Sequence, residues 1–286
     1  MKKRHILSLC LILFASCPAF AEEAPPGGFG VSLGPSQIRF SGPPGETQEG
    51  TVRIWNKSQG PMRFMVEIAD LGNENDAAGK LNRIFPTAGT LPHSCSAWIQ
   101  LEQNELEVAA RSHQDVKFLL AVPPDASGGR ASVIFFRGMP SADKSGDALA
   151  DPARPTTTVQ IQPRIGVLVF YEAQGTVQRT GKLEEFKVTP PGEESPLVLQ
   201  YTFENTGNTD ILLSGNFYIL APDQALAAKG AINTVRTFPG DRGLTETLWE
   251  GELDPGQYHL VASFELGPDS QEVIVREANF EVPEKI

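Results

Sequence analysis

The sequence predicts an all-β protein with two β-sandwich domains in tandem, residues 22–177 and 178–286, behind a signal peptide, residues 1–21. Short segments of alternating apolar and polar residues recur along the chain, with Gly, Pro, Asn and Asp between them, which is typical of antiparallel sandwiches. Residues 30–175 show no strong helical periodicity. Each half also contains a strand that runs into an Asn turn, "IWNKS" and "FENTG", and this internal echo favours two related sandwiches.

The first segment has the pattern of a secretory signal peptide. Basic residues at 2–4 precede an apolar run at 6–14, and an Ala-Phe-Ala triplet follows at 19–21. The run is shorter than the ~20 residues that a membrane-spanning helix needs, so we expect cleavage after Ala21 and a periplasmic or otherwise exported protein. The alternative is a lipoprotein acylated at Cys17, although the "FASC" motif has Phe where a lipid-attachment box has Leu.

The charge of the exported chain limits its partners. The sequence has 24 Lys and Arg, three of them within the signal peptide, so the remaining 21 face 35 Asp and Glu and give a net charge of about −14. Such a charge excludes nucleic acid and anionic membrane surfaces as partners, and no later segment predicts a membrane span. Two of the three cysteines, Cys10 and Cys17, lie in the signal peptide, which leaves Cys95 without an intrachain partner.

The strands of the first domain are indicated by their alternating apolar residues. One face carries Met62, Phe64, Val66 and Ile68, and another carries Val116, Phe118, Leu120 and Val122. The segment "RASVIFFRG" is apolar on both faces, as a central strand is. Residues 138–158 have no periodicity and predict a long mobile loop, which is either functional or a tolerated surface insertion.

The segment "VQIQPRIGVLVFYEA", residues 159–173, changes its pattern halfway. It alternates at first and is apolar on both faces from Ile165 to Tyr171. We expect one set of side chains to pack inside its own sandwich, namely Ile165, Val167, Val169 and Tyr171. Leu168 and Phe170 are then expected to face the neighbouring domain or the 138–158 loop.

The second domain is expected to begin near Lys182. Leu197, Leu199, Tyr201 and Phe203 share one face of a strand, and a later strand alternates Tyr258, Leu260, Ala262, Phe264 and Leu266. Tyr258 follows an Asp-Pro-Gly turn and resembles the tyrosine corner of immunoglobulin-like sandwiches. The segment "APDQALAAKG" is interpreted either as a short helix capped by Gly230 or as an Ala-rich loop.

The sequence contains no convincing catalytic, cofactor or metal site. His93 and Cys95 are two residues apart and could share a strand face, but no third group orients them, so we interpret them as a loop histidine and a half-buried cysteine. The acidic segment "DLGNENDAAG" has the oxygen ligands of a calcium loop without its spacing, and it is interpreted as a solvated hairpin loop. The sequence therefore predicts a protein that is not an enzyme and has no cofactor.

Four segments of the first domain resemble the periplasmic pilus-assembly chaperones, the PapD-like superfamily, and related extracytoplasmic immunoglobulin-like proteins. These segments are "GVSLGPSQIRF", "VRIWNKSQGPMRFMVEI", "VPPDASGGRASVIFF" and "VQIQPRIGVLVFYEA". The signal peptide and the two tandem sandwiches match the same architecture. The resemblance implies an immunoglobulin-like fold in both domains and a protein partner, namely a subunit of a pilus or of another surface structure.

The resemblance also implies a site. In these chaperones the last strand of the first domain lends apolar side chains to an incomplete subunit, and two basic side chains grip the subunit's terminal carboxylate. Carried over to this chain, the partner-binding strand comprises Val159, Ile161 and Ile165, with Pro163 interrupting the series because it lacks an N–H. The two basic positions fall on Gln37 and near Gly166, which are not basic. The nearby Arg39 and Arg164 are the candidate carboxylate anchors.

Two functions from different classes follow. The first is a non-enzymatic periplasmic chaperone-like protein that binds surface or pilus subunits by β-strand addition, which the long loop and the half-alternating strand favour. The alternative is a structural or adhesive module of the cell envelope without chaperone activity, which Pro163 and the missing basic positions favour.

Overall fold

The computed structural model describes residues 30–140, 162–192, 194–267, 270 and 272–284. Apart from one short 3-10 turn, η1 (Ser96–Trp98), all the regular structure in these ranges is β-strand, which confirms the predicted fold class. The signal peptide, Cys17 and most of the expected 138–158 loop lie outside the described residues. No helix in the described ranges could span a membrane.

The first domain is a sandwich of two sheets. One sheet has the order β1 (Val31–Gly34), β3 (Thr47–Asn56), β9 (Ser112–Ala121) and β7 (Ile99–Leu101). The other has the order β2 (Gln37–Gly42), β11 (Arg164–Ala173), β10 (Gly129–Gly138), β4 (Met62–Asp70) and β8 (Glu105–Val108). The apolar faces predicted for β4 and β9 meet in one core, because alternate side chains of a strand point to the same side.

The second domain is a smaller sandwich with a similar plan. One sheet has the order β12 (Gly181–Thr189), β13 (Leu197–Asn205) and β16 (Arg242–Trp249). The other has the order β15 (Leu226–Thr237), β14 (Ile211–Leu220), β17 (Gly256–Glu265) and β18 (Val273–Val282). The Tyr258 hydroxyl donates a hydrogen bond to the Asp254 carbonyl at 2.9 Å, which is the geometry expected of a tyrosine corner. The helix interpretation of "APDQALAAKG" is wrong, and the loop interpretation holds only for residues 221–225, because residues 226–230 belong to β15.

The reason for that error is packing between strands. Residues 226–230 pair with β14, and the Phe217 ring of β14 lies over Gly230, where an added Cβ would meet the ring at 2.4 Å. A glycine that accommodates a neighbouring aromatic ring is common in strands, but the sequence alone does not distinguish it from a helix C-cap.

A hairpin of the first domain reaches the second domain. It is formed by β5 (Gly72–Asn75) and β6 (Leu81–Ile84), and it lies beside β16, where Lys80 forms an isolated parallel bridge with Leu244. The Asn75 side chain donates to the Arg242 carbonyl at 2.9 Å, and the Leu244 N–H donates to the Gly79 carbonyl at 2.8 Å. The expectation of a solvated hairpin loop is therefore wrong in part: the hairpin exists, but it is docked.

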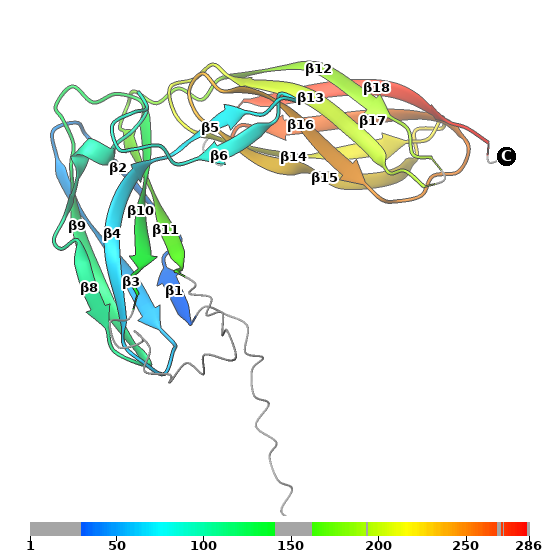
Figure 1. The fold of residues 1–286 in the computed structure, drawn as a ribbon. Helices are drawn as coiled ribbons and strands as arrows, with labels where there is room; N and C mark the ends of the chain where they lie inside the picture. Colours follow the sequence, from blue (N-terminus) through cyan, green and yellow to red (C-terminus); the bar gives the residue numbers. More distant parts are fainter. Residues whose placement is uncertain (1–29, 141–161, 193, 268–269, 271, 285–286) are drawn as a thin grey trace, which may run out of the picture.

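The two sandwiches meet at one end and form a bent molecule (Figure 1). Phe170 of β11 is fully buried against Phe238 of the second domain, together with Leu71 and Ala131, and Leu168 packs beside them. On the opposite face of β11, Val167, Val169 and Tyr171 lie in the core of their own sandwich, with Ile165 packed against it. Both expectations for this apolar segment are confirmed.

Candidate functional site

One half of strand β11 has a neighbour on only one side. Along its whole length β11 pairs with β10, from Arg164 opposite Arg137 to Glu172 opposite Gly129. On the other side, β2 pairs with it only from Leu168 to Ala173. In the part of the chain that the structure describes, no strand pairs with this side of residues 164–167. We call this side of residues 164–167 the open edge.

The open edge exists because the chain changes sheets just before β2. Strand β1 belongs to the opposite sheet, where it pairs with β3 as far as Gly34, and β2 begins at Gln37. The last bond on this side is donated by the Leu168 N–H to the Ser36 carbonyl at 3.1 Å. Before Ser36 the chain leaves the sheet, so the line of β2 ends beside Leu168.

The backbone of the open edge carries hydrogen-bonding groups with which no described strand pairs. The Gly138 N–H donates to the Pro163 carbonyl at 2.8 Å, so the polar groups of Pro163 face β10. Because these groups alternate sides along a strand, those of Arg164 and Gly166 face the open edge. The N–H that Pro163 lacks would therefore have faced β10. Pro163 does not interrupt the open edge as its sequence position suggested.

Gly166 lies at one of the two positions to which the resemblance assigns a basic residue, and the fold leaves no room there for a basic side chain. An added Cβ there would lie 2.8 Å from both the Phe135 ring and the Val133 side chain, on the face opposite the sandwich core. Phe135 thus occupies the space that a side chain at 166 would need. Gln37, the other equivalent position, is exposed at the start of β2.

Arg39, one candidate anchor, is bound between the two domains. Its guanidinium donates to both carboxylate oxygens of Asp210, at 3.0 and 2.9 Å, and it also contacts Glu172 at 2.5 Å. The guanidinium lies over the Phe170 ring, 4.4 Å from its centroid. Arg236 shares Asp210, so two guanidiniums surround a carboxylate whose side chain is only 5% exposed.

Arg164, the other candidate anchor, lies at the open edge. Its guanidinium stacks on the Phe135 ring at 3.6 Å from the centroid and lies 3.7 Å from Glu67. Glu67 is bound more closely by Arg137, at 2.8 Å. The Arg164 side chain remains 42% exposed, so it can contact a ligand without breaking a buried ion pair.

The predicted partner-binding strand is described only at its end. Val159 and Ile161 lie outside the described residues, whereas Ile165 is partly buried against the core of its own sandwich. The residues that sequence reasoning missed are Phe135, Glu67 and Phe85, which surround the open edge on the outer face of the sheet. For Phe135 the signal was that β10 is apolar on both faces, which indicated burial without saying what covers it, whereas Glu67 and Phe85 had no such signal.

His93 and Cys95 do not form a reactive pair. Cys95 is fully buried, and burial raises the pKa of its thiol to about 12, which keeps it protonated. Burial lowers the pKa of His93, whose ring stacks on Phe238 at 4.9 Å and lies 3.1 Å from the Leu71 carbonyl. His93 therefore belongs to the contact between the domains.

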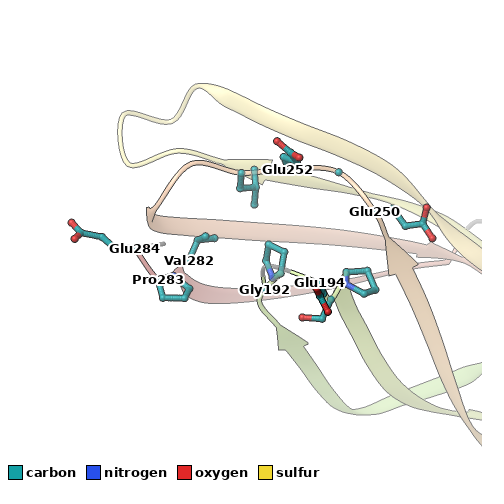
Figure 2. A pocket seen from close by; sticks show the side chains of 12 residues that line it. Gly192, Glu194, Glu250, Glu252, Val282, Pro283 and Glu284 are labelled. Carbon is teal, nitrogen blue, oxygen red and sulfur yellow. The ribbon is translucent and has the colours of Figure 1, made fainter. Parts of the chain in front are cut away.

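Figure 2 shows a hollow of about 630 Å³ at the far end of the second domain. Four glutamates line it, Glu194, Glu250, Glu252 and Glu284, around a floor that includes Leu253 and Val282. Among the described lining residues there is no histidine and no basic group. No cluster of metal-binding side chains occurs in the described ranges.

No protein-family model and no curated protein sequence matches the chain. In structure, the chain is similar to fimbrial chaperones. The class 5 fimbriae chaperone CfaA is 9% identical, with 89% of this chain and 100% of that chain covered and a TM-score of 0.47. The chaperone DraB of E. coli is 12% identical, with 89% and 96% covered and a TM-score of 0.41.

A third similar structure is the CsuC–CsuE chaperone–tip adhesion subunit pre-assembly complex from the archaic chaperone-usher Csu pili of Acinetobacter baumannii. It is 10% identical, covers 86% of this chain and 97% of that chain, and has a TM-score of 0.44. At these identities, and with TM-scores below 0.5, function has to be argued from the open edge itself.

Proposed function

We propose that the chain is an exported, non-enzymatic chaperone-like protein that binds an extended segment of another protein along the open edge of β11. The observation that supports this proposal concerns the backbone of Arg164 and Gly166. Their polar groups face away from β10, and the pairing with β2 on that side goes no further than the bond from Leu168 to Ser36. An extended segment that continues the line of β2 would satisfy these groups and complete the sheet.

Two features make an added strand favourable here. The backbone of residues 164–167 is already extended, because β10 pairs with β11 along this segment. Binding therefore costs β11 little conformational entropy. Ile165, which is only partly buried against the core, also offers an apolar contact to the inward side chains of the added segment. Val159 and Ile161 would extend the same edge in the partner-binding strand.

The candidate anchors divide between two roles. Arg164, exposed beside the open edge, is proposed to contact a carboxylate of the partner. Arg39 is proposed to hold the two domains together, because Asp210 and Glu172 already surround its guanidinium. This occupied state of Arg39 also favours the alternative function, a structural or adhesive module of the cell envelope whose two domains are fixed at one angle.

Amide hydrogen exchange tests strand addition directly. In the free chain, the N–H groups of Arg164 and Gly166 should exchange quickly, whereas that of Ile165, bonded to β10, should be protected. In a complex with a partner isolated by crosslinking from a photoreactive residue at Gln162, both edge amides should become protected. Capture of a partner without this protection would overturn strand addition and favour the alternative module.

A double variant tests the part of the strand that precedes β11. V159D/I161D should abolish crosslinking from position 162 while changing the free energy of unfolding by less than about 1 kcal/mol. The matched control is V273D/V275D, which alters two exposed valines, 53% and 49% exposed, on the edge strand β18 of the second domain. The control should retain the partner. Equal loss in both variants would argue against a specific role for residues 159–161.

A further inference from the structure

The outer face of the sheet beside the open edge carries an aromatic and basic surface. In one row across the sheet, Gly166 pairs with Phe135, which pairs with Glu67. In the next row, Arg164 pairs with Arg137. These five residues face the same side as Phe170, away from the core of the first sandwich, because side chains alternate along each strand.

The apolar part of this surface consists of Phe135 and Phe85 and lies beside Gly166. Phe135 lies over Gly166 and is contacted edge to face by Phe85, with ring centroids 5.1 Å apart. Phe85 is 41% exposed, and Leu168 packs beside Phe135 and is partly buried. A residue of an added strand opposite Gly166 would meet no side chain from β11, so a large apolar group could lie across the glycine against Phe135 and Leu168.

The second part has an excess of positive charge. Arg137 and Arg164 share the single carboxylate of Glu67, at 2.8 and 3.7 Å. The nearest further pair, Arg63 with Glu105, is balanced within itself at 3.4 Å. The two shared guanidiniums are 43% and 42% exposed, so one positive charge remains unmatched at the open edge of a chain that is strongly acidic overall.

Resting on the proposed strand addition, we propose that the bound segment carries a large apolar residue opposite Gly166 and an acidic residue opposite Arg164, two positions apart. This spacing follows from the two-residue period of a strand, which puts both side chains on the outer face. The carboxylate belongs to an internal Asp or Glu side chain, because the segment continues past Arg164 along residues 162–163. The partner is thus recognised on both faces, by apolar contacts inward and by this pair outward.

Disulfide tethering measures such a preference even when affinity is low, because the tether raises the effective concentration of the peptide. A cysteine is introduced by S36C, at the exposed residue where the line of β2 ends. The chain is expressed from residue 22, so Cys95 is the only other thiol, and its pKa of about 12 and complete burial keep it unreactive.

The probes are nine-residue peptides, each with a thiol at one end and the other end acetylated or amidated, with Val at inward positions. The outward pair is Glu and Phe in either order, Ala and Ala, or Lys and Phe. The fraction tethered is read by mass spectrometry against increasing β-mercaptoethanol. The peptide with Glu and Phe, in one of its two orders, should resist about five-fold more reductant than the Ala peptide, since each contact is worth about 0.5–1 kcal/mol.

Two variants assign the preference to its residues. R164E should reverse the order of the Glu and Lys peptides, and F85S should reduce the preference for Phe over Ala. A thiol introduced by S195C, at an exposed residue beside the hollow at the far end of the second domain, should show no preference. One further peptide, with its carboxyl terminus left free, is compared with its amide. Preference for the free terminal carboxylate would overturn the assignment to an internal side chain.

The remaining outcomes separate this inference from the proposed function. If all peptides stay tethered to the same extent, and more than a simple thiol without a peptide, the preference for Glu and Phe would be wrong and strand addition would stand. Retention no better than that of the simple thiol would overturn both.

Discussion

Arg39 of the first domain and Asp210 of the second are joined by two hydrogen bonds, at 2.9 and 3.0 Å, although 171 positions separate them in the chain. Arg236 contacts the same carboxylate from within the second domain. The Asp210 carboxylate, which is nearly inaccessible to water, therefore joins Arg39 of the first domain to the second domain.

Removal of the Asp210 charge should destabilise the protein strongly. D210N leaves the guanidiniums of Arg39 and Arg236 without their carboxylate, and the free energy of unfolding should fall by about 3 kcal/mol. D241N is the matched control, because burial raises the pKa of Asp241 and its negative charge is therefore already unfavourable. Urea denaturation followed by tryptophan fluorescence measures both. Equal losses would show that the Arg39 contact has no special weight.

Stability should fall in acid because of two carboxylates. Burial opposes ionisation of both, but hydrogen bonds outweigh it: Arg39 and Arg236 hold the pKa of Asp210 below its usual value, and Ser94 with the Leu91 N–H does the same for Asp70. A lowered folded-state pKa stabilises the fold above the unfolded value of about 3.9. That contribution is lost as pH falls through the folded-state pKa.

Unfolding measured from pH 7 down to pH 3 tests this dependence. The wild type should lose stability below about pH 4, and D210N and D70N should each show a shallower decline. Asp241 acts in the opposite direction, since a raised folded-state pKa means that its ionisation destabilises the fold as pH rises. D241N should therefore keep or steepen the acid decline. A wild-type profile that is flat down to pH 3 would contradict the assignment.

The docked hairpin should restrict motion between the domains. Asn73 donates to the Arg236 carbonyl at 2.9 Å and to Asp241 at 2.6 Å, and Asn75 donates to Arg242. N73A/N75A should broaden the distribution of distances between spin labels placed on the two domains. The control N233A removes a bond to the Glu246 carbonyl within the second domain and should leave the distribution narrow. Identical distributions in both variants would mean that the hairpin does not hold the angle.

The fit of Phe135 over Gly166 can be tested by complementary changes in size. G166A should lower the free energy of unfolding by about 1–3 kcal/mol, because the new methyl group would overlap the ring and Val133. F135L should restore part of this loss in the double variant, although F135L alone leaves a gap. Additive losses in thermal denaturation, with no rescue, would show that the two residues do not compete for the same space.

The sequence by itself determined the strands and the two cores. Val116, Phe118 and Leu120 repeat every second residue, and burial of such a face is a strong and local effect, so the pattern can be recognised without knowing the neighbour. The same reasoning assigned Val167 to the core and Phe170 to a contact with either the neighbouring domain or the 138–158 loop. It failed at "APDQALAAKG", where the partner strand β14, and no local preference, decides the conformation.

Only the tertiary structure decided which strand edge is open and what surrounds it. The open edge depends on where β2 stops, and the orientation of Pro163 depends on its bond to Gly138. The partners of Arg39 and the ring over Gly166 come from distant segments, and an ion pair or a filled glycine position leaves no periodic trace in a sequence. Local alternation therefore specifies what is buried, whereas long-range pairing specifies what remains available to a partner.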